Sequence, residues 1–376
     1  MIKNRKLRII IIISLIILIA IVTFSGIYIG VKIGRKNKDE IDFSSIRGSA
    51  NKVVMFIGDG MGENHIKVTS KYYDKDMYMN SFDIKGYATT YSNSVLSPTD
   101  SAASASALAT GKKYDNREVS RHNGKDIETI AEYAKSKGYG VGIVTTDSLD
   151  GATPASFSSH ANDRSDSDDI IKGQINSNID LFLGAGKSTY EAYKEEFLNK
   201  GYSYINNYEN LNINDSKIIA TFDNVVSKIG TNGTPTLEML TQFAINYFET
   251  NFANGYFIMI EGAHIDKKSH SNEIFKMMEY LNSFDESIKI VTEKIKNQKG
   301  TTIVVTADHE TGGLKYNNED DYKINNSLYT RTSHSKTNVP YFIKLNPINE
   351  TINIKRLFPH IIDNTDIFNF YKTCLG

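Results

Sequence analysis

Short strand-forming runs alternate with helical segments from residue 52 onward, and this alternation limits the possible folds more than any other feature of the chain. The predicted strands are 52–57, 140–145, 179–183, 256–260 and 301–306. The predicted helices are 101–109, 126–137, 236–251 and 273–296. Such alternation is typical of a mostly parallel sheet with helices on both faces. We therefore predict an α/β fold in which a large, mostly parallel sheet is sandwiched by helices over residues 52–376.

The N-terminal region differs in composition from the rest of the chain. A basic segment, 1–8, precedes an uncharged stretch at 9–31. That stretch is long enough to cross a hydrocarbon core of about 30 Å as a helix. We predict a transmembrane signal anchor, with a cleaved signal peptide or a buried helix as the alternatives, followed by a polar stalk over 32–51. Basic residues lie on both sides of the span, so charge does not decide its orientation.

Charge and cysteine content exclude two classes of protein. The net charge is −1 and no basic stripe is evident, so binding to nucleic acid through phosphate neutralisation is not expected. The single cysteine, Cys374, cannot form a disulfide within the chain. Stability must therefore come from the hydrophobic core and from any bound metal.

Acidic and imidazole side chains follow the carboxyl ends of three predicted strands. Asp59 comes after 52–57, Glu261 directly follows 256–260, and Asp308 begins an Asp-His pair after 301–306. Open α/β sheets bind ligands in the crevice beyond the carboxyl ends of their strands. We therefore expect these side chains to meet in one site.

The residue types in this group favour three metal positions. Asp59, Asp308 and His309 form one candidate zinc site with room for a substrate oxygen. Glu261, Thr153 and a second oxygen of Asp59 form an all-oxygen site, which suits Mg²⁺.

A second candidate zinc site combines residues that are distant in sequence. Asp266 and His270 are four residues apart, so a helical turn projects them to the same side. His334 supplies the third ligand. Taken alone, His334 would be read as a surface histidine, and its assignment depends on the need for a third protein ligand.

A serine and an arginine are the candidates for the nucleophile and for phosphate binding. Ser101 opens an alanine-rich helix directly after Asp100. The helix N-terminus and a nearby zinc ion would both favour its alkoxide. Arg164 can hold two phosphate oxygens with its planar fork. Together with the metals, these residues predict in-line attack by Ser101 on phosphorus.

At this point the motifs resemble those of the alkaline phosphatase family over nearly all of 52–376. The matching segments are Asp100-Ser101-Ala102-Ala103-Ser104-Ala105, Thr306-Ala307-Asp308-His309, Glu261-Gly262-Ala263 through His270, and Ala152-Thr153-Pro154 with Arg164. The resemblance implies hydrolysis of small phosphate monoesters through a phosphoserine, in a homodimer with two Zn²⁺ and one Mg²⁺ per subunit. It also implies that Lys267 faces the phosphate, and that the catalytic domain lies outside the cytoplasmic membrane, either anchored or secreted after cleavage.

Two departures from the family pattern concern the magnesium position. Gly151 stands where the family usually has an Asp or His that supports this metal. The usual carboxylate partner of Lys267 is also absent, and Asp150 is the candidate substitute. We therefore expect weak Mg²⁺ binding by Glu261 and Thr153 with Asp59.

Alternative functions fit less well. Arg164 argues against a phosphodiesterase, because a diester has fewer free oxygens to hold. A sulfatase would require Pro and Arg where this chain has Ala103 and Ala105. An inactive binding ectodomain would not be expected to keep complete ligand sets. The remaining histidines are expected to be surface or core residues, with His264 either supporting the site or structural: His65, His122, His160, His264 and His360.

Overall fold

The computed structural model describes residues 12–23, 41–228, 234–317, 323–348 and 356–376. The chain divides into two compact units. One unit comprises 1–41 together with Val95–Ser97, and the other comprises 42–94 and 98–376. All of the predicted site residues belong to the second unit.

The strands and helices within the described ranges are as follows. The strands are β1 (Lys52–Ile57), β2 (Ile84–Thr89), β3 (Arg121–His122), β4 (Lys125–Asp126), β5 (Gly140–Ser148), β6 (Leu181–Ala185), β7 (Ser203–Ile205), β8 (Ile218–Phe222), β9 (Tyr256–Glu261), β10 (Thr301–Thr306), β11 (Glu310–Thr311), β12 (His334–Ser335), β13 (Val339–Asn346) and β14 (Ile361–Asp363). The α-helices are α2 (Glu63–Tyr73), α3 (Ser101–Thr110), α4 (Ile130–Ser136), α5 (Ala152–Ser158), α6 (Ser167–Asn176), α7 (Lys187–Tyr190), α8 (Lys194–Asn199), α9 (Leu237–Asn251), α10 (His264–His270), α11 (Ile274–Ile295) and α12 (Asn364–Leu375). The 3₁₀ helices are η1 (Ser44–Ile46), η2 (Tyr78–Ser81), η3 (Glu191–Tyr193), η4 (Tyr208–Asn210) and η5 (Asn326–Leu328).

Ten of these strands form one sheet in the order β14-β2-β13-β10-β1-β9-β5-β6-β8-β7. β1 lies between β10 and β9 and is parallel to both. β5 continues the parallel arrangement beyond β9, and β13 runs antiparallel to its neighbours β10 and β2. The predicted mostly parallel α/β sheet is therefore confirmed. Because β10, β1, β9 and β5 are parallel neighbours, their carboxyl ends lie along the same edge.

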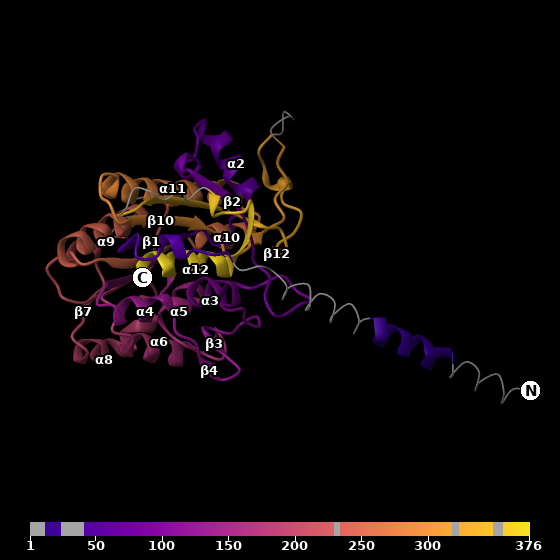
Figure 1. Cartoon of the computed structure of the whole chain (residues 1–376), viewed down its shortest axis with the longest axis horizontal. Helices are drawn as coiled ribbons and strands as arrows, with labels where there is room; N and C mark the ends of the chain where they lie inside the picture. Colours follow the sequence, from indigo (N-terminus) through magenta and orange to yellow (C-terminus); the bar gives the residue numbers. More distant parts are fainter. Residues whose placement is uncertain (1–11, 24–40, 229–233, 318–322, 349–355) are drawn as a thin grey trace, which may run out of the picture. The chain divides into compact units, whose positions relative to one another are not determined.

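Helices cover both faces of this sheet, with α9 and α11 on one side and α3 to α6 on the other (Figure 1). On the first side, the ring of Phe56 in β1 meets Phe284 of α11 at 5.8 Å. On the second side, Phe257 of β9 meets Phe157 of α5 at 6.1 Å and Tyr371 of α12 at 5.7 Å. The central strands are rich in apolar residues, as expected where both faces of a sheet are covered.

The structure changes some predicted boundaries. β5 extends to Ser148, three residues past the predicted end, and β9 includes Glu261. α4 begins at Ile130, because Thr129 caps it in a reciprocal pair with Glu132. β6 corresponds to the predicted strand 179–183, and β8 and β7 extend the main sheet beyond it.

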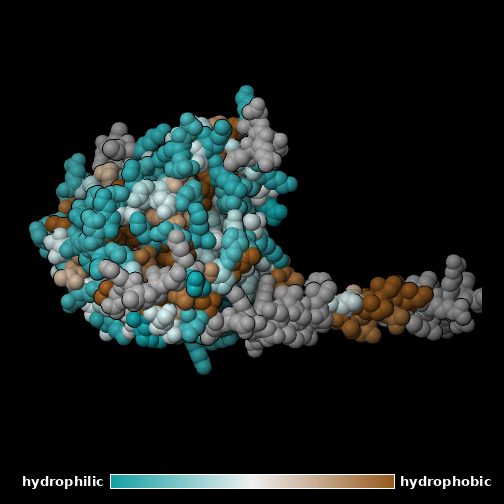
Figure 2. Space-filling model, turned by 45° about the horizontal axis from the view of Figure 1, so that its top comes forward, coloured by the Kyte–Doolittle hydropathy of each residue, from teal (hydrophilic) through white to brown (hydrophobic). Residues whose placement is uncertain are grey.

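The N-terminal predictions are described only in part. Residues 12–23 form a helix with exposed apolar side chains, which Figure 2 shows as a hydrophobic surface. The rest of the predicted transmembrane span, 9–31, lies outside the described residues. Within the described ranges, no helix is long and apolar enough to cross a membrane.

The stalk predicted at 32–51 ends earlier than expected. Residues from Asp42 onward belong to the second unit, where Phe43 and Ile46 are buried. The ring of Phe43 meets that of Phe370 in α12 at 5.7 Å. Apolar contacts of this kind hold the segment against the domain, so it is not a free spacer.

Candidate active site

Three neighbouring strands end at the candidate site. Asp59 lies two residues beyond β1, Glu261 is the last residue of β9, and Asp308 lies two residues beyond β10. In the sheet register, Ile57 pairs with Glu261 on one side and with Thr306 on the other. The parallel register therefore brings the three acidic side chains to the same edge, as the sequence predicted.

Asp59, Asp308 and His309 form the first candidate metal cluster. One potential ligand atom from each residue lies within 4.8 Å of the others. The Nε2 atom of His309 is 3.6 Å from Asp59 Oδ1 and 3.3 Å from Asp308 Oδ2. Both carboxylate oxygens are buried, and neither has a hydrogen-bond partner among the described residues. Because unpaired buried oxygens are costly, these atoms fit a bound cation.

The electrostatics of this cluster favour the same interpretation. Burial, and then the neighbouring carboxylate of Asp308, raise the pKa of Asp59 well above its usual value. Burial, followed by the adjacent His334 ring, holds the pKa of His309 well below its usual value. The imidazole of His309 is therefore neutral and able to bind a metal. A cation would relieve the repulsion between the carboxylates.

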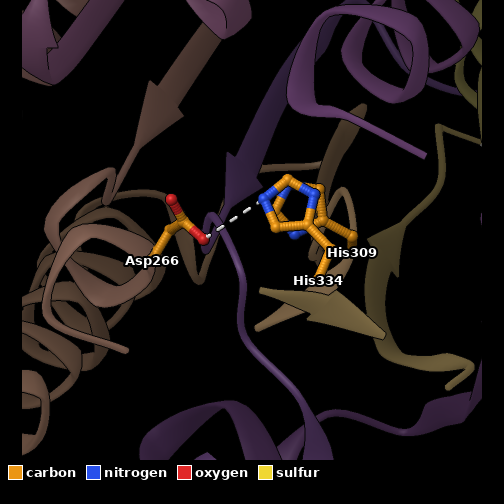
Figure 3. A group of neighbouring side chains, drawn as sticks. All are labelled: Asp266, His309 and His334. Atoms are coloured by element: carbon orange, nitrogen blue, oxygen red, sulfur yellow. Dashed lines mark ion pairs between the residues drawn. The ribbon is translucent and has the colours of Figure 1, made fainter. Parts of the chain in front are cut away.

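Asp266, His270 and His334 come together as the sequence predicted, and His309 joins them. His270 Nε2 is 3.4 Å from Asp266 Oδ1 and 3.1 Å from His334 Nε2. Asp266, His309 and His334 also offer ligand atoms within 4.8 Å of one another. Figure 3 shows the Asp266 carboxylate facing the two stacked imidazoles, whose ring centres are 3.5 Å apart. The two candidate zinc positions are therefore adjacent.

Backbone carbonyls and one threonine orient these ligands. His270 Nδ1 contacts the carbonyl oxygen of Thr332, and His334 Nδ1 lies 2.8 Å from that of Thr99. The Thr311 hydroxyl donates a hydrogen bond to the Asp266 carboxylate. Contacts of this kind hold the Nε2 atoms toward the site.

Glu261 and Thr153 form an oxygen-rich position beside Asp59. Burial, and then the charge of Asp147, raise the pKa of Glu261 to about 8. The Thr145 hydroxyl donates to Glu261 Oε2. The Thr153 hydroxyl is buried and has no hydrogen bond of normal geometry among the described residues. It lies close enough to the Glu261 carboxylate to lower the pKa of that group, against the effect of burial. These oxygens suit a hard cation such as Mg²⁺.

Ser101 is the first residue of α3 and faces the metal clusters. Asp100 caps this helix by accepting a 3.0 Å hydrogen bond from the backbone N–H of Ala103. The Ser101 hydroxyl is 3.2 Å from His309 Nε2, and the side chain is almost fully buried. This position places the hydroxyl at the helix N-terminus beside the candidate zinc ligands.

Two basic residues lie at the rim of the site. Arg164 Nη1 is 3.2 Å from Asp100 Oδ2, and the arginine side chain is one-third exposed. Lys267 forms an ion pair with Asp147. The expected partner, Asp150, instead accepts a hydrogen bond from the Ser148 hydroxyl. The substitute proposed from the sequence is thus corrected from Asp150 to Asp147.

The sequence model of the alkaline phosphatase family matches residues 50–356. This chain belongs to the alkaline phosphatase family. Alkaline phosphatase 3 of Bacillus subtilis is 35% identical over 302 residues, covering 74% of this chain and 63% of that protein. Alkaline phosphatase 4 of the same organism is 31% identical over 313 residues, covering 77% and 68%. The chain thus spans less than two thirds of the length of the first relative.

Solved alkaline phosphatases have the same fold. The cold-active enzyme from a psychrophilic Shewanella species matches with a TM-score of 0.75 at 24% identity, covering 86% of this chain and 100% of that one. The enzyme from the Antarctic bacterium TAB5 matches with a TM-score of 0.74 at 24% identity, covering 87% and 98%. At this level of identity the similarity establishes the architecture of this alkaline phosphatase family member.

Sequence reasoning missed several residues that surround the site of this family member. Asp147 and Thr145 lie at the end of β5, which is parallel to β9 and ends at the same sheet edge. The strand-end argument that found Glu261 therefore applies to them too. Thr99 and Thr311 carry no such pattern, because their contacts depend on how loops return to the site.

The other described histidines lie outside the two candidate zinc clusters, and His122 instead groups with Asp115 and Glu118, of which Asp115 is exposed. His65 is fully buried and contacts the Ser269 hydroxyl at 3.1 Å. His264 stacks on Tyr280 with ring centres 4.6 Å apart. His160 pairs with an acidic partner, Glu132. The contacts of His65 and His160 fit the surface or core roles expected for them, and for His264 both of the expected roles stay open.

Proposed function

We propose that this alkaline phosphatase family member hydrolyses phosphate monoesters through a phosphoserine at residue 101, with two Zn²⁺ and one Mg²⁺ per subunit. One observation carries the proposal: the Ser101 hydroxyl lies 3.2 Å from His309 Nε2, between the candidate zinc clusters and the N-terminus of α3. A serine so placed can attack a phosphorus atom held by the same cations.

Three sets of residues would hold the cations. Asp266, His270 and His334 would hold one zinc ion, and Asp59, Asp308 and His309 the other. Glu261 and Thr153 would hold magnesium together with Asp59. When bound, such cations neutralise phosphate charge and favour the deprotonated nucleophile. Buried oxygens of Asp59, Thr153 and Asp308 have no hydrogen-bond partner among the described residues, which supports this assignment.

Hydrolysis of the monoester takes place in two displacements at phosphorus. In the first, Ser101 Oγ forms a bond to phosphorus as the bond from phosphorus to the alcohol oxygen breaks, and the alcohol leaves. In the second, water attacks the phosphoserine, releases inorganic phosphate and restores the Ser101 hydroxyl. The N-terminus of α3 stabilises negative charge on Oγ when the serine attacks and when it leaves.

Arg164 and Lys267 would bind the non-bridging oxygens of the phosphate. The 3.2 Å ion pair with Asp100 holds the Arg164 guanidinium at the start of the helix that carries Ser101. A planar guanidinium can contact two oxygens at once. A monoester offers more such oxygens than a diester does, so this arrangement favours monoesters.

We also propose that residues 9–31 anchor the protein with its catalytic domain outside the cytoplasmic membrane, and that the enzyme is a homodimer. The uncharged stretch preceded by basic residues supports the anchor. Secretion after cleavage would instead release a domain that lacks this segment. Detection of the domain in membranes or in culture medium decides between them.

The activity is tested with the full-length chain saturated with Zn²⁺ and Mg²⁺. We expect hydrolysis of p-nitrophenyl phosphate and much slower hydrolysis of bis-p-nitrophenyl phosphate. Ser101→Ala should lower the monoester rate by orders of magnitude with zinc content unchanged, whereas Ser136→Ala in α4, exposed and remote, should be neutral. Preferential diester hydrolysis, or full activity of Ser101→Ala, would contradict the proposal.

A further inference from the structure

The carboxylate of Asp147 occupies the space beside Gly151. A Cβ atom placed on Gly151 would lie 2.9 Å from Asp147 Oδ2 and 2.9 Å from the carbonyl oxygen of Ser148. Both distances are shorter than a carbon atom tolerates. A side chain at position 151 is therefore incompatible with the observed position of Asp147.

Asp147 is fixed in this position by three contacts. Its backbone N–H donates to Thr145 Oγ1 at 2.8 Å, and its Oδ1 accepts from the backbone N–H of Ser148 at 2.7 Å. The same carboxylate forms the ion pair with Lys267. The side chain is therefore ordered by its neighbours.

The same contacts connect Asp147 to the oxygen-rich position. Thr145 accepts from the Asp147 backbone and donates to the carboxylate of Glu261. Gly151 precedes α5, whose second residue is Thr153.

We propose that Asp147 is a positioning residue for the third cation and for Lys267, and that it replaces a side chain at position 151. This inference rests on the proposed function, because it requires a cation at Glu261, Thr153 and Asp59. The carboxylate of Asp147 supplies negative charge beyond the residues that would bind the third cation directly. It also holds the Lys267 ammonium group at the rim of the site. Gly151 then leaves the space that the Asp147 side chain occupies. The third cation position therefore does not lack a supporting carboxylate.

Calorimetric titration of the zinc-loaded, full-length protein with Mg²⁺ tests this inference. Partners outside the first ligand shell commonly change metal affinity about 10–100-fold, so we expect Asp147→Asn to raise the Kd for Mg²⁺ by a similar factor. Asp150→Asn is the matched control, since Asp150 lies nearby in the chain and contacts Ser148 instead. It should leave the Kd unchanged. Zinc content should remain the same in both variants.

A second pair of variants tests the exclusion of side chains at position 151. Gly151→Ala should weaken Mg²⁺ binding, because its methyl group must displace Asp147. In an Asp147→Ala background the same substitution should have a smaller further effect, because only the contact with the Ser148 carbonyl oxygen then remains. Equal fold-changes in both backgrounds would overturn the claim that Asp147 occupies this space.

The result that overturns the positioning role is an Asp147→Asn protein that binds Mg²⁺ as the wild type does. A wild-type protein that binds no Mg²⁺ when zinc is saturating would overturn it too. The first result leaves the proposed function intact, whereas the second would also remove Mg²⁺ from it. Phosphoserine formation at Ser101 is measured separately by trapping. The failure of this inference and the failure of the proposed function are therefore distinguishable.

Discussion

At the scale of single residues, unpaired buried charge is the feature that links this structure to chemistry. Asp59 and Asp308 each keep a buried carboxylate oxygen that has no hydrogen-bond partner among the described residues. An isolated buried charge costs several kcal/mol unless it is neutralised. Burial raises the pKa of both carboxyls, and their mutual repulsion adds to the shift of Asp59. Burial of these two carboxyl groups therefore destabilises the folded protein, and a bound cation would remove that destabilisation.

Arg164 leads to the first prediction. Arg164→Ala should weaken inhibition by inorganic phosphate by about 1.5–3 kcal/mol, or roughly tenfold to a hundredfold, because charged hydrogen bonds to phosphate are lost. The control is Arg47→Ala, since Arg47 is exposed and precedes β1, at the end of that strand opposite to Asp59. Phosphate inhibition constants for the three proteins provide the measurement. Equal inhibition of Arg164→Ala and the wild type would remove Arg164 from the substrate site.

Site residues that follow the carboxyl end of a parallel strand could be predicted from the sequence alone. Asp59, Glu261 and Asp308 were found because parallel strands deliver their last residues to one edge. Asp147 was missed because the predicted strand ended at residue 145, whereas β5 continues to Ser148, so the strand-end rule was not applied to it. Proximity in sequence favoured Asp150, but its carboxylate pairs with Ser148 instead.

At the scale of elements, the turn after β1 holds the two metal clusters together. Gly60 has a φ of +71°, a left-handed conformation, and its N–H donates to Asp308 Oδ1 at 3.1 Å. A Cβ atom there would lie 2.9 Å from Asp266 Cα and 2.8 Å from Asp266 Oδ1. The turn therefore packs directly against the ligand-bearing helix α10.

Gly60→Ala should thus lower both stability and zinc content. Left-handed backbone alone costs a non-glycine residue about 1–2 kcal/mol, and the clash with Asp266 adds to this cost. Gly124→Ala separates the two effects, since Gly124 has a φ of +72° and no atom within 4 Å of an added Cβ. It should show the backbone cost with full zinc content. Chemical denaturation and elemental analysis test both variants, and normal zinc content in Gly60→Ala would disprove the close packing.

His65 joins α2 to α10 and predicts a pH dependence. Gly62 N–H donates to His65 Nδ1 at 3.2 Å, and Nε2 contacts the Ser269 hydroxyl at 3.1 Å. Burial lowers the pKa of His65 to about 4, below the value near 6.5 expected in the unfolded chain. Between these values the unfolded state binds more protons than the folded state. The contribution of His65 to stability is therefore full above pH 6.5 and is lost as the pH falls to 4.

The expected loss is about 3 kcal/mol at most over this range. His65→Gln should remove that part of the acid sensitivity, whereas His360→Gln, at an exposed position, should not. Unfolding free energies should be measured at several pH values with a chelator present, so that zinc loss does not contribute. Parallel pH curves for His65→Gln and the wild type would contradict the assignment.

Elements were predictable where local rules act alone. β1, β10 and the start of α3 follow from apolar runs and a capping Asp100. The late start of α4 depends on the reciprocal pair of Thr129 and Glu132. The antiparallel insertion of β13 depends on long-range pairing, which one sequence without an alignment does not reveal.

At the scale of the whole molecule, metal binding should contribute to folding stability. The clusters draw on β1, β9, β10, α10 and the β11–β12 pair, so a cation would join distant parts of the chain. A ligand that binds only the folded state stabilises it by about 2.7 kcal/mol at a free concentration of about 100 Kd. The stabilisation disappears when the metal is removed.

Chelation should therefore lower the midpoint of thermal unfolding, and added Zn²⁺ should restore it in a concentration-dependent way. A variant with Asp308→Asn should respond less, because it loses a buried ligand and a buried charge together. Differential scanning calorimetry provides the measurement. A midpoint that is the same with chelator and with saturating Zn²⁺ would show that the clusters bind no zinc.

The proposed mechanism depends on covalent phosphorylation of Ser101 during turnover. The most direct measurement is acid quenching of the zinc-loaded enzyme during hydrolysis of a monoester, followed by mass spectrometry of the peptide that contains α3. We predict one phosphoryl group on Ser101, absent in Ser101→Ala and absent without substrate. Turnover at the wild-type rate with no phosphorylated Ser101 at any quench time or pH, or phosphate on another residue, would contradict the account.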